Sequence, residues 1–575
     1  MGNAAVILPP KPLTDDLICM DIQRIILITG IAVISYLMIL QWQQDYGMRS
    51  SFDNPGVNSS AYEAGKTKSD TADDFITVPT ITSEAQGLTD IDSSPTGEQI
   101  KVFTDTLEVI IDPRGGDIIH VALPQYLANI DKPNIPFVLL EQNNRRTYTA
   151  QSGLTGKHGT DVKTRPLYQV DQNQFELTDG KDQLQVIMSL NDMNGAKISK
   201  IYTFTRGSYL INLTYKVDNR GSNLWSANLF GQIKRDGSED PNKTTDMGMT
   251  AYLGAAFSLV EDKYFRYDFS DMEDADFKRK APAGWVAMLQ HYFVSAWIPD
   301  PNSIHTYSTR VSKGNYIAGF ISPSLDLAPG TNGSVSTNFY AGPKIQDVLE
   351  KISPNLNLVV DYGWLWWISQ PLFVLMKMMH GLIDNWGFAI LLVTLCVKAL
   401  FFYPSAVSYR SMAKMRALAP EITKLKERFG DDRQKMSQAV MELYKREKAN
   451  PISGCFPILI QMPVFLGLYW MLMESVELRH APFLLWIKDL SVMDPYFVLP
   501  ILMGGSMFIQ QLLNPTPPDP MQAKIMKMLP IIFTVFFLGF PSGLVLYWVC
   551  NNVLSIIQQY VITRRIEAAM GKSKS

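Results

Sequence analysis

The stretch that decides the fold is apolar and carries one charge near its middle: Asn385-Trp-Gly-Phe-Ala-Ile-Leu-Leu-Val-Thr-Leu-Cys-Val-Lys398-Ala-Leu-Phe-Phe-Tyr-Pro404. About 20 apolar residues are the length of a transmembrane helix. A lysine at the centre of such a helix costs roughly 2.5–3.5 kcal/mol on insertion scales. Lys398 is therefore expected to face water, a partner or a functional cavity.

The rest of the 575-residue chain is unevenly apolar: the ends are rich in apolar residues and the middle is polar. The formal net charge of −3 argues against a general affinity for nucleic acid. The four cysteines, Cys19, Cys396, Cys455 and Cys550, leave residues 20–395 without any. An exported domain there would hold no disulfide. The spacing of the cysteines fits no zinc site, so we expect packing roles and no metal or cofactor.

The N-terminal part is predicted to hold a membrane anchor and a linker. An apolar run over 25–40 follows Arg24 and precedes Trp42, which places the start in the cytoplasm. No cleavage pattern follows, so an uncleaved anchor over 22–41, after a cytoplasmic segment 1–21, is favoured over a signal peptide. A lipoprotein is excluded because Cys19 precedes the apolar run. Residues 42–100 are rich in Ser, Asp, Thr and Gly and predict a flexible linker.

Residues 101–350 alternate between short apolar strands and turn clusters. The segments 201–205 and 209–217 flank Arg206-Gly-Ser208 and read as a hairpin with period-two alternation. One long strand over 101–111, ending at the turn Asp112-Pro-Arg-Gly-Gly, and strands over 315–321 and 333–340 continue the pattern. This domain is predicted to be a large β-sandwich. Residues 351–384 follow, and their three tryptophans predict an amphipathic helix in the membrane interface.

The remaining spans are predicted over 385–404, 455–473, 495–513, 525–540 and 543–562, which with the anchor makes six. Residues 405–454 carry eleven Lys/Arg against six Asp/Glu, so 11 − 6 gives +5, and the tail 563–575 is also basic. Both segments are therefore predicted to lie in the cytoplasm, and so are both termini. The β-domain is then predicted to lie on the other side of the membrane. The sequence thus predicts an α+β membrane protein with six transmembrane helices.

Polar residues in these spans usually face the bundle interior. They are Thr394, Gln461, Gln510, Gln511, Asn551, Asn552 and Gln558. For each amide the simplest reading is an interhelical hydrogen bond. Lys398 differs because no span contains an acidic residue to pair with it. That absence argues against a proton pump and favours a wet, positively charged recess for acidic or polar peptide segments.

The basic segment 405–454 is predicted to be a helical hairpin. Met412, Met415, Ile422 and Leu425 fall near helical spacing, and Gly430 ends the first helix. Asp431 or Asp432 can cap the second helix, whose apolar stripe is Met436, Val440 and Leu443. Two readings stay open: a solvated face attracted to anionic lipid, and a docking surface for polypeptide or ribosome.

Four strings resemble the YidC membrane protein insertases of Gram-negative bacteria. They are Ser411-Met-Ala-Lys-Met-Arg, Gly454-Cys-Phe-Pro-Ile-Leu-Ile-Gln-Met-Pro463, Ser475-Val-Glu-Leu-Arg479 and Phe540-Pro-Ser-Gly-Leu-Val-Leu-Tyr547. Met20-Asp-Ile-Gln-Arg24 resembles the usual start of such proteins, so residues 1–19 are expected to be an over-extended start.

The resemblance implies an inner-membrane insertase and chaperone, not an enzyme, with a five-helix core over 385–562 and a periplasmic β-supersandwich. Its partners would be nascent membrane proteins, the ribosome, the Sec translocon with its accessory subunits, and anionic lipids. The family has a positively charged groove, and the residue that supplies this charge corresponds to Lys398, where the family commonly has Arg. Lys keeps the charge but loses the planar donor fork of Arg. The implied substrate contacts are Thr394, Gln461, Met462, Phe465, Phe537 and Trp548, with Gln511, Asn551 and Asn552 as groove polar residues.

Two other functions were weighed. A transporter or channel would need inverted repeats or acidic coupling residues, and the sequence shows neither. The β-domain resembles sugar-epimerising folds, which suggests the alternative of an envelope sugar-modifying enzyme. The candidate acids or bases of such an enzyme are His120, His158, His291 and His305. Their spacing forms no motif, and a fold by itself does not carry a function.

Overall fold

A computed structural model describes residues 98–162, 164–192, 195–242, 251–430, 432–447, 449, 456–514 and 520–574. By its contacts the chain divides into Met1–Asp70 and Thr71–Ser575, so every described residue belongs to the second unit. The predicted anchor over 22–41, the linker up to residue 97, Cys19 and Cys455 lie outside the described residues.

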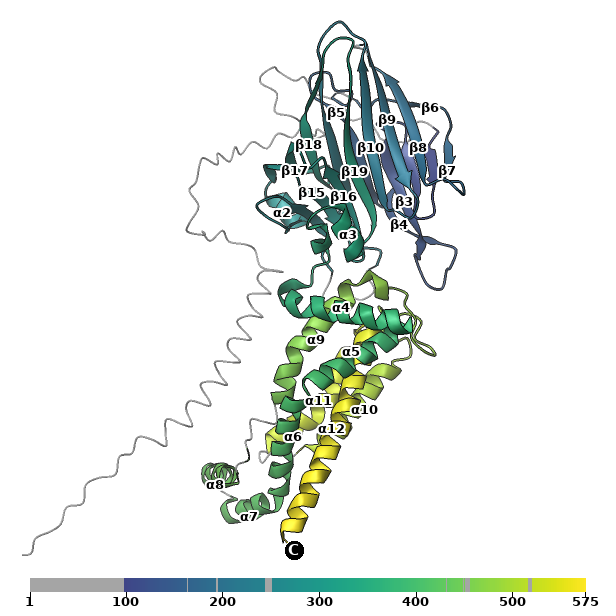
Figure 1. Cartoon of the computed structure of the whole chain (residues 1–575). Helices are drawn as coiled ribbons and strands as arrows, with labels where there is room; N and C mark the ends of the chain where they lie inside the picture. The colour runs from purple at the N-terminus through teal and green to yellow at the C-terminus, as the bar shows by residue number, and fades with distance from the viewer. Residues whose placement is uncertain are drawn as a thin grey trace, which may run out of the picture. The chain divides into compact units, whose positions relative to one another are not determined.

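The first part of the described chain is built of strands (Figure 1). They are β1 Ile100–Phe103, β2 Glu108–Asp112, β3 Asp117–Leu127, β4 Pro136–Gln142, β5 Thr147–Thr155, β6 Gln169–Val170, β7 Gln174–Glu176, β8 Gln183–Asn191, β9 Ala196–Thr205, β10 Leu210–Asn219, β11 Trp225–Asp236, β12 Gly254–Ser258, β13 Phe265–Asp268, β14 Lys278–Pro282, β15 Trp285–Leu289, β16 Phe293–Pro299, β17 Ile304–Ser312, β18 Asn315–Leu327 and β19 Asn332–Pro343.

Helices make up most of the remainder. They are α2 Phe269–Asp274, α3 Gln346–Ile352, η1 Leu356–Val359, η2 Gly363–Leu365, α4 Trp366–Ile383, α5 Trp386–Leu400, α6 Phe402–Ala417, α7 Ala419–Phe429, α8 Arg433–Arg446, α9 Phe456–Glu474, η4 Val476–Leu478, α10 Val498–Leu513, α11 Pro520–Phe536, η5 Phe537–Gly539 and α12 Ser542–Lys574.

The described strands form two sheets, which confirms the predicted β-sandwich. One sheet has the order β14-β17-β18-β11-β5-β4-β3-β2-β1-β7, and the other β13-β12-β15-β16-β19-β10-β9-β8-β6. The predicted hairpin is β9–β10, paired antiparallel with Phe204 opposite Ile211. Its turn contains Gly207 at φ 69°, a conformation that costs glycine little. The segment 101–111 is not one strand: Thr104 N donates to Leu107 O at 2.8 Å and folds it into β1 and β2.

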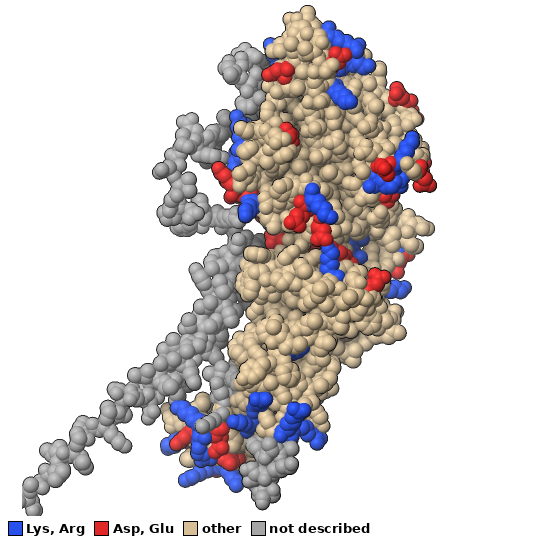
Figure 2. Space-filling model, viewed as in Figure 1, with Lys and Arg blue, Asp and Glu red and all other residues tan. Residues whose placement is uncertain are grey.

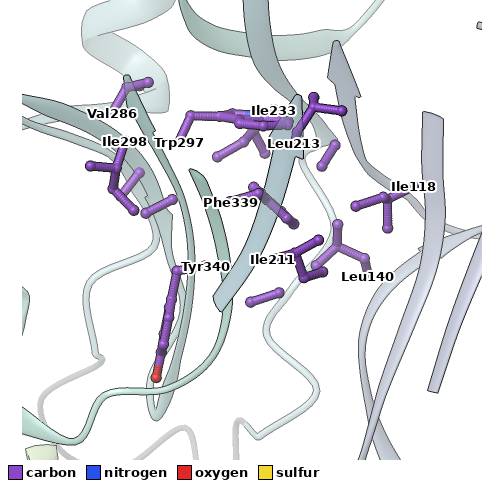
Figure 3. Packing of buried hydrophobic residues seen from close by; sticks show 14 of the residues in the cluster. Ile118, Leu140, Ile211, Leu213, Ile233, Val286, Trp297, Ile298, Phe339 and Tyr340 are labelled. Carbon is purple, nitrogen blue, oxygen red and sulfur yellow. The ribbon is translucent and has the colours of Figure 1, made fainter. Parts of the chain in front are cut away.

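The core of the sandwich lies between the two sheets (Figure 3). Ile118 and Ile233 come from the first sheet, and Leu213, Trp297 and Phe339 come from the second. All five are fully buried. Along strands such as β2 and β10, buried and less buried residues alternate and place one face on this core, whereas β12, β15 and β16 are buried along their whole length.

A charged cluster is also buried in the sandwich. Arg165 forms ion pairs with Asp117 and, at 2.5 Å, with Asp161. Lys200 is fully buried and donates from Nζ to two backbone carbonyls at 2.8 and 3.1 Å. Burial lowers the pKa of Lys200 to about 7 and raises the pKa of Asp117. Such charges are tolerated in an interior because they pair with one another and with carbonyls.

The helical part departs from the predicted spans at Phe401. The predicted span 385–404 is broken there: α5 ends at Leu400 and α6 begins at Phe402, at an angle of 67° to it. Pro404 lies in the first turn of α6, where its missing N–H leaves no helical hydrogen bond unmade. Lys398 therefore lies in the last turn of α5, close to the bend and not in the middle of a straight helix.

The other predicted spans correspond to α9, α10, α11 with η5, and α12. α12 continues beyond residue 562 through the basic tail, because no glycine or proline interrupts it before Gly571. Among the described residues, Ser542–Ile566 is the one helix that is by itself long and apolar enough to cross a membrane. The bent pair α5–α6 passes the same test when taken together, and Leu459–Glu474 and Val498–Leu513 are shorter apolar helices.

The surface of the helical part is apolar. Figure 2 shows few charged side chains over the helices, and lysine and arginine gathered at the end formed by α7 and α8. Large apolar residues are exposed on this surface, among them Leu400, Ile501 and Ile531 at 75%, 62% and 67%. A surface of this kind is suited to lipid and not to water. On α4, the predicted interface helix, Trp366 and Trp367 are exposed in the same way.

Candidate functional site

Lys398 binds a hydroxyl group and not a carboxylate. Its Nζ donates to Ser555 Oγ at 2.7 Å, and that hydroxyl donates to the carbonyl of Asn551 at 2.7 Å. No described Asp or Glu forms an ion pair with Lys398, in agreement with the lack of acidic residues in the spans. The bend between α5 and α6 brings the amine to α12, since both helices pack against α12.

A polar stripe on α12 continues from this contact. Asn551, Asn552, Ser555 and Gln559 recur at helical spacing and are each at least 93% buried. Asn552 donates to Ser506 Oγ on α10 at 3.0 Å, and Gln559 donates to the side chain of Asn514 at 2.9 Å. We call the residues Lys398, Ser506, Gln511, Asn551, Asn552, Ser555 and Gln559 the polar cluster.

Several buried atoms in and beside the polar cluster have no hydrogen-bond partner among the described residues. They are Gln511 Oε1, Asn551 Oδ1, Gln559 Oε1 and Trp548 Nε1. An unsatisfied buried polar atom costs about 1–3 kcal/mol, and in proteins ordered water commonly satisfies such atoms. The arrangement of donors and acceptors therefore suits a hydrated space among apolar helices.

Aromatic residues from three elements meet beside the polar cluster. The ring of Phe465 on α9 lies 4.5 Å from that of Trp548 on α12, and 6.1 Å from that of Phe537 on η5. The rings of Phe537 and Trp548 lie 5.4 Å apart. Phe537 is buried, whereas Phe465 and Trp548 are half-buried. Phe465 and Trp548 are therefore partly accessible, whereas neighbouring side chains cover Phe537.

Three further predicted site residues lie apart from this contact group. Thr394 is buried and donates within its own helix to Ile390 O at 2.7 Å. Gln461 donates to the Tyr547 hydroxyl, which joins α9 to α12. Met462 is 39% exposed on the outside of α9. The structure thus links Lys398 to Asn551 through Ser555 and brings Phe465 to Trp548, while Thr394 has the contacts of a packing residue.

Sequence reasoning missed Ser506, Ser555 and Gln559. Each is a polar residue in a long apolar stretch, and Ser555 and Gln559 continue the helical period that begins at Asn551. That period is the signal that would have found them. Ser506 carries no such signal, because its role depends on the packing of α10 against α12.

The far end of these helices is closed by the loop 479–497. Asp494 is buried and accepts from Trp486 Nε1 at 3.0 Å and from the backbone N–H of Leu499 at 2.7 Å. Ser542 at the start of α12 donates to Val492 O, from N–H at 2.7 Å and from Oγ at 2.6 Å. This hydrogen-bonded loop thus covers the ends of the helices that lie opposite the hairpin.

The predicted hairpin is correct only in part, because its first helix is broken at Leu418: Met412 and Met415 lie on α6, and Ile422 and Leu425 lie on α7. α7 ends before Gly430, and Asp432 caps α8 by accepting from Lys435 N–H at 3.1 Å. Most of the predicted apolar stripe, but not Leu443, packs into a small cluster with Ile562 of α12. Its members are Tyr409, Met412, Met415, Val440, Tyr444 and Ala449, with Leu418, Ile422, Leu425 and Ile562 against them. Met436 is half-buried and outside this cluster.

Three of the four candidate histidines of the β-sandwich contact separate partners. His158 accepts from Ser226 N–H at 3.0 Å, His305 contacts Ser322 Oγ at 3.1 Å, and His291 contacts Met473 O at 2.8 Å. A cavity of about 440 Å³ lies in the sandwich, and none of the four histidines lines it. Among the described residues no His, Cys, Asp and Glu side chains gather as a metal site.

Comparison with known proteins identifies the family. Residues 99–375 match the YidC periplasmic domain, and residues 378–569 match the 60Kd inner membrane protein family. The membrane protein insertase YidC of Marinomonas sp. (strain MWYL1) is 53% identical over 554 residues, which cover 95% of this chain and 100% of that relative. The membrane protein insertase YidC of Pseudomonas fluorescens (strain SBW25) is 51% identical over 563 residues, covering 96% and 100%.

One solved structure, an active YidC insertase with its first transmembrane domain resolved, aligns at a TM-score of 0.38 and 18% identity, over 80% of this chain and 92% of that chain. The sequence matches cover both the β-sandwich and the helices that carry the polar cluster. This chain therefore belongs to the family of YidC membrane protein insertases, inner-membrane proteins with a periplasmic domain.

Proposed function

We propose that this protein moves hydrophobic segments of nascent proteins from the cytoplasm into the inner membrane through a hydrated, positively charged groove around Lys398. The observation that supports it best is a lysine among apolar helices that a single hydroxyl binds at 2.7 Å, beside buried polar atoms without protein partners. Insertion needs no chemical reaction, because each CH₂ group that enters lipid contributes about 0.8 kcal/mol. The groove lowers the barrier for the polar flanks of the segment.

The side chains divide this work between charge, hydration and apolar contact. Lys398 attracts the acidic or polar flank, and Gln511, Asn551 and Asn552 hold water beside it. Phe465 and Trp548 offer ring surfaces, and Met462 offers a flexible apolar one, so varied helices can slide without fixed geometry. Gln461 fixes α9 to α12 through Tyr547. Thr394 and Phe537 join the contact surface once the helices part.

The topology proposed for this function has six spans with both termini in the cytoplasm. The anchor over 22–41 and the linker over 42–100 lead to a periplasmic domain over 101–350, and the interface helix segment covers 351–384. The five-span core over 385–562 carries the cytoplasmic hairpin, and the tail is basic. The eleven Lys/Arg of residues 405–454 support this orientation, because basic loops stay in the cytoplasm.

The partners proposed are nascent chains delivered by the ribosome, the Sec translocon with its accessory subunits for some clients, and anionic lipids at the hairpin. The basic, exposed surfaces of α7 and α8 suit both ribosomal RNA-rich surfaces and lipid headgroups.

Insertion into proteoliposomes tests the function. Liposomes that contain the purified full chain should protect the membrane segment of a freshly translated single-span client from protease, whereas liposomes without protein should not. Equal protection in both preparations would contradict the proposed function.

A further inference from the structure

The motif Ser475-Val-Glu-Leu-Arg479 has no part in the groove, yet its residues are bound closely by the β-sandwich. Val476 belongs to the hydrophobic core of the sandwich and is 2% exposed. His291, just before β16, contacts the carbonyl of Met473 at 2.8 Å. The last turn of α9 and the residues after it are thus packed as if they were part of the β-domain.

A buried ion pair lies at the same place. Lys344 Nζ, directly after β19, lies 3.3 Å from Glu474 Oε2 at the end of α9. The two side chains are 2% and 9% exposed. Removing one partner of such a pair leaves a buried charge uncompensated, whereas replacing both with apolar residues of similar size is often neutral. The pair therefore joins the end of α9 to the sandwich at a place where the loss of either partner alone is costly.

Arg479 makes the second connection. Its guanidinium donates to Leu127 O at 2.7 Å and to Asn242 Oδ1 at 3.1 Å. The same group lies over the rings of Phe137 and Phe293, 5.3 and 5.5 Å from their centroids. Those two rings stack on each other at 4.2 Å. A planar donor fork that also stacks on aromatic rings is a role that lysine cannot fill.

α9 is also the helix that carries Gln461, Met462 and Phe465. Pro463 lies inside this helix and has no N–H to donate, so the helix is weakened beside these residues. Phe465 lies nine residues before Glu474, about 14 Å along a helix that rises about 1.5 Å per residue. Whatever holds the end at Glu474 therefore sets where Phe465 lies against Trp548.

We propose that the β-sandwich braces α9 through the Lys344–Glu474 ion pair and Arg479, and so positions Phe465 in the groove. The inference rests on the proposed insertase function and assigns Lys344, Glu474 and Arg479 as positioning residues. They touch no client; they act through α9.

The test compares K344M, E474L and the double variant K344M/E474L in the full chain, reconstituted in proteoliposomes. Each single variant should reduce client insertion at least fivefold at an unchanged membrane level, and should speed amide exchange in residues 464–478 but not in the core strands of the sandwich. The double variant should return insertion to within twofold of the unchanged chain, since no buried charge is left unpaired. Single variants that insert normally, or a double variant as defective as the worse single one, would overturn the proposal.

Arg479→Lys provides a second and milder test should a single variant fail to accumulate. It keeps the charge and loses the fork and the stacking, so insertion should fall at least threefold. The matched control is Arg220→Lys, because Arg220 is exposed and forms a surface ion pair with Asp218 at 2.7 Å. Normal insertion by Arg479→Lys would also overturn the brace. Failure of the unchanged chain to insert clients would instead count against the proposed function. Amide exchange would still show whether Lys344, Glu474 and Arg479 hold α9, because that measurement does not depend on insertion.

Discussion

Replacing Lys398 with glutamate should abolish rescue of cells depleted of their own insertase and reduce insertion of a client with an acidic outer flank at least tenfold. The glutamate side chain can still accept a hydrogen bond from Ser555, so the local contact has a substitute while the sign of the charge is reversed. A carboxylate in this place would repel the acidic flank that the ammonium group attracts. Opposite unit charges 4 Å apart interact by about 4 kcal/mol at an effective dielectric constant of 20.

Three companion variants separate charge from packing. Lys398→Arg should insert clients within about twofold of the unchanged chain, because only the positive field is needed. The insertion activity of Lys398→Gln should lie between those of Lys398→Glu and Lys398→Arg, because glutamine keeps a hydrogen-bond donor but carries no charge. Lys216→Glu makes the same change of net charge on an exposed strand residue of the β-sandwich and should have no effect. Full activity of Lys398→Glu would remove the positive groove from the mechanism.

The second large effect concerns the apolar stripe of the cytoplasmic hairpin. Changing Met415, Ile422, Met436 and Leu443 to serine together should reduce insertion at least tenfold while the protein still reaches the membrane. Burying one such side chain stabilises the folded state by about 1.5–3 kcal/mol, so the loss of three or four of them is expected to unfold two short helices. Met415 and Leu443 are buried, and Ile422 and Met436 are half-buried. The hairpin should therefore lose its packing against α12.

A matched control tests whether the charges alone suffice. Lys424, Glu427, Lys435 and Glu442 are exposed on the same helices, and changing all four to serine leaves the net charge unaltered. That variant should insert clients normally. Binding to vesicles with anionic lipid should be retained by both quadruple variants. Normal insertion by the apolar-stripe variant would show that the hairpin serves only to bind lipid.

Local signals were sufficient to predict much of the fold. The β9–β10 hairpin followed from alternation around Gly207, and the end of α7 and the start of α8 followed from Gly430 and the cap Asp432, whereas the break between α6 and α7 at Leu418 was not predicted. These features depend on the residues within one turn or one pair of strands, so the sequence contains what determines them. The parallel pairing of β1 with β7 could not be predicted in this way, because the 70 residues 104–173 lie between the two strands and no local pattern records that Phe103 pairs with Glu176.

The candidate site was predictable in type but not in arrangement. Lys398 was evident because a charge in an apolar stretch needs a reason. The helical period from Asn551 points to Ser555 as a polar residue of the same face, but its contact with Lys398 could not be predicted, because that contact depends on the bend at Phe401. That bend was missed because an apolar run continues through it without a glycine, and the proline follows by three residues. The contacts of Arg479 were missed for another reason: its partners come from four separate segments of the chain.

Site-specific photocrosslinking to a ribosome-bound nascent membrane protein tests the groove most directly. A photoreactive phenylalanine analogue at Phe465 or Trp548 should crosslink to the hydrophobic segment of the client as it emerges. The same analogue at Ile501 or Ile531, which are 62% and 67% exposed toward the lipid-suited surface, should not. Equal crosslinking at all four positions, or crosslinking at Ile501 and Ile531 alone, would contradict a groove lined by Lys398, Phe465 and Trp548.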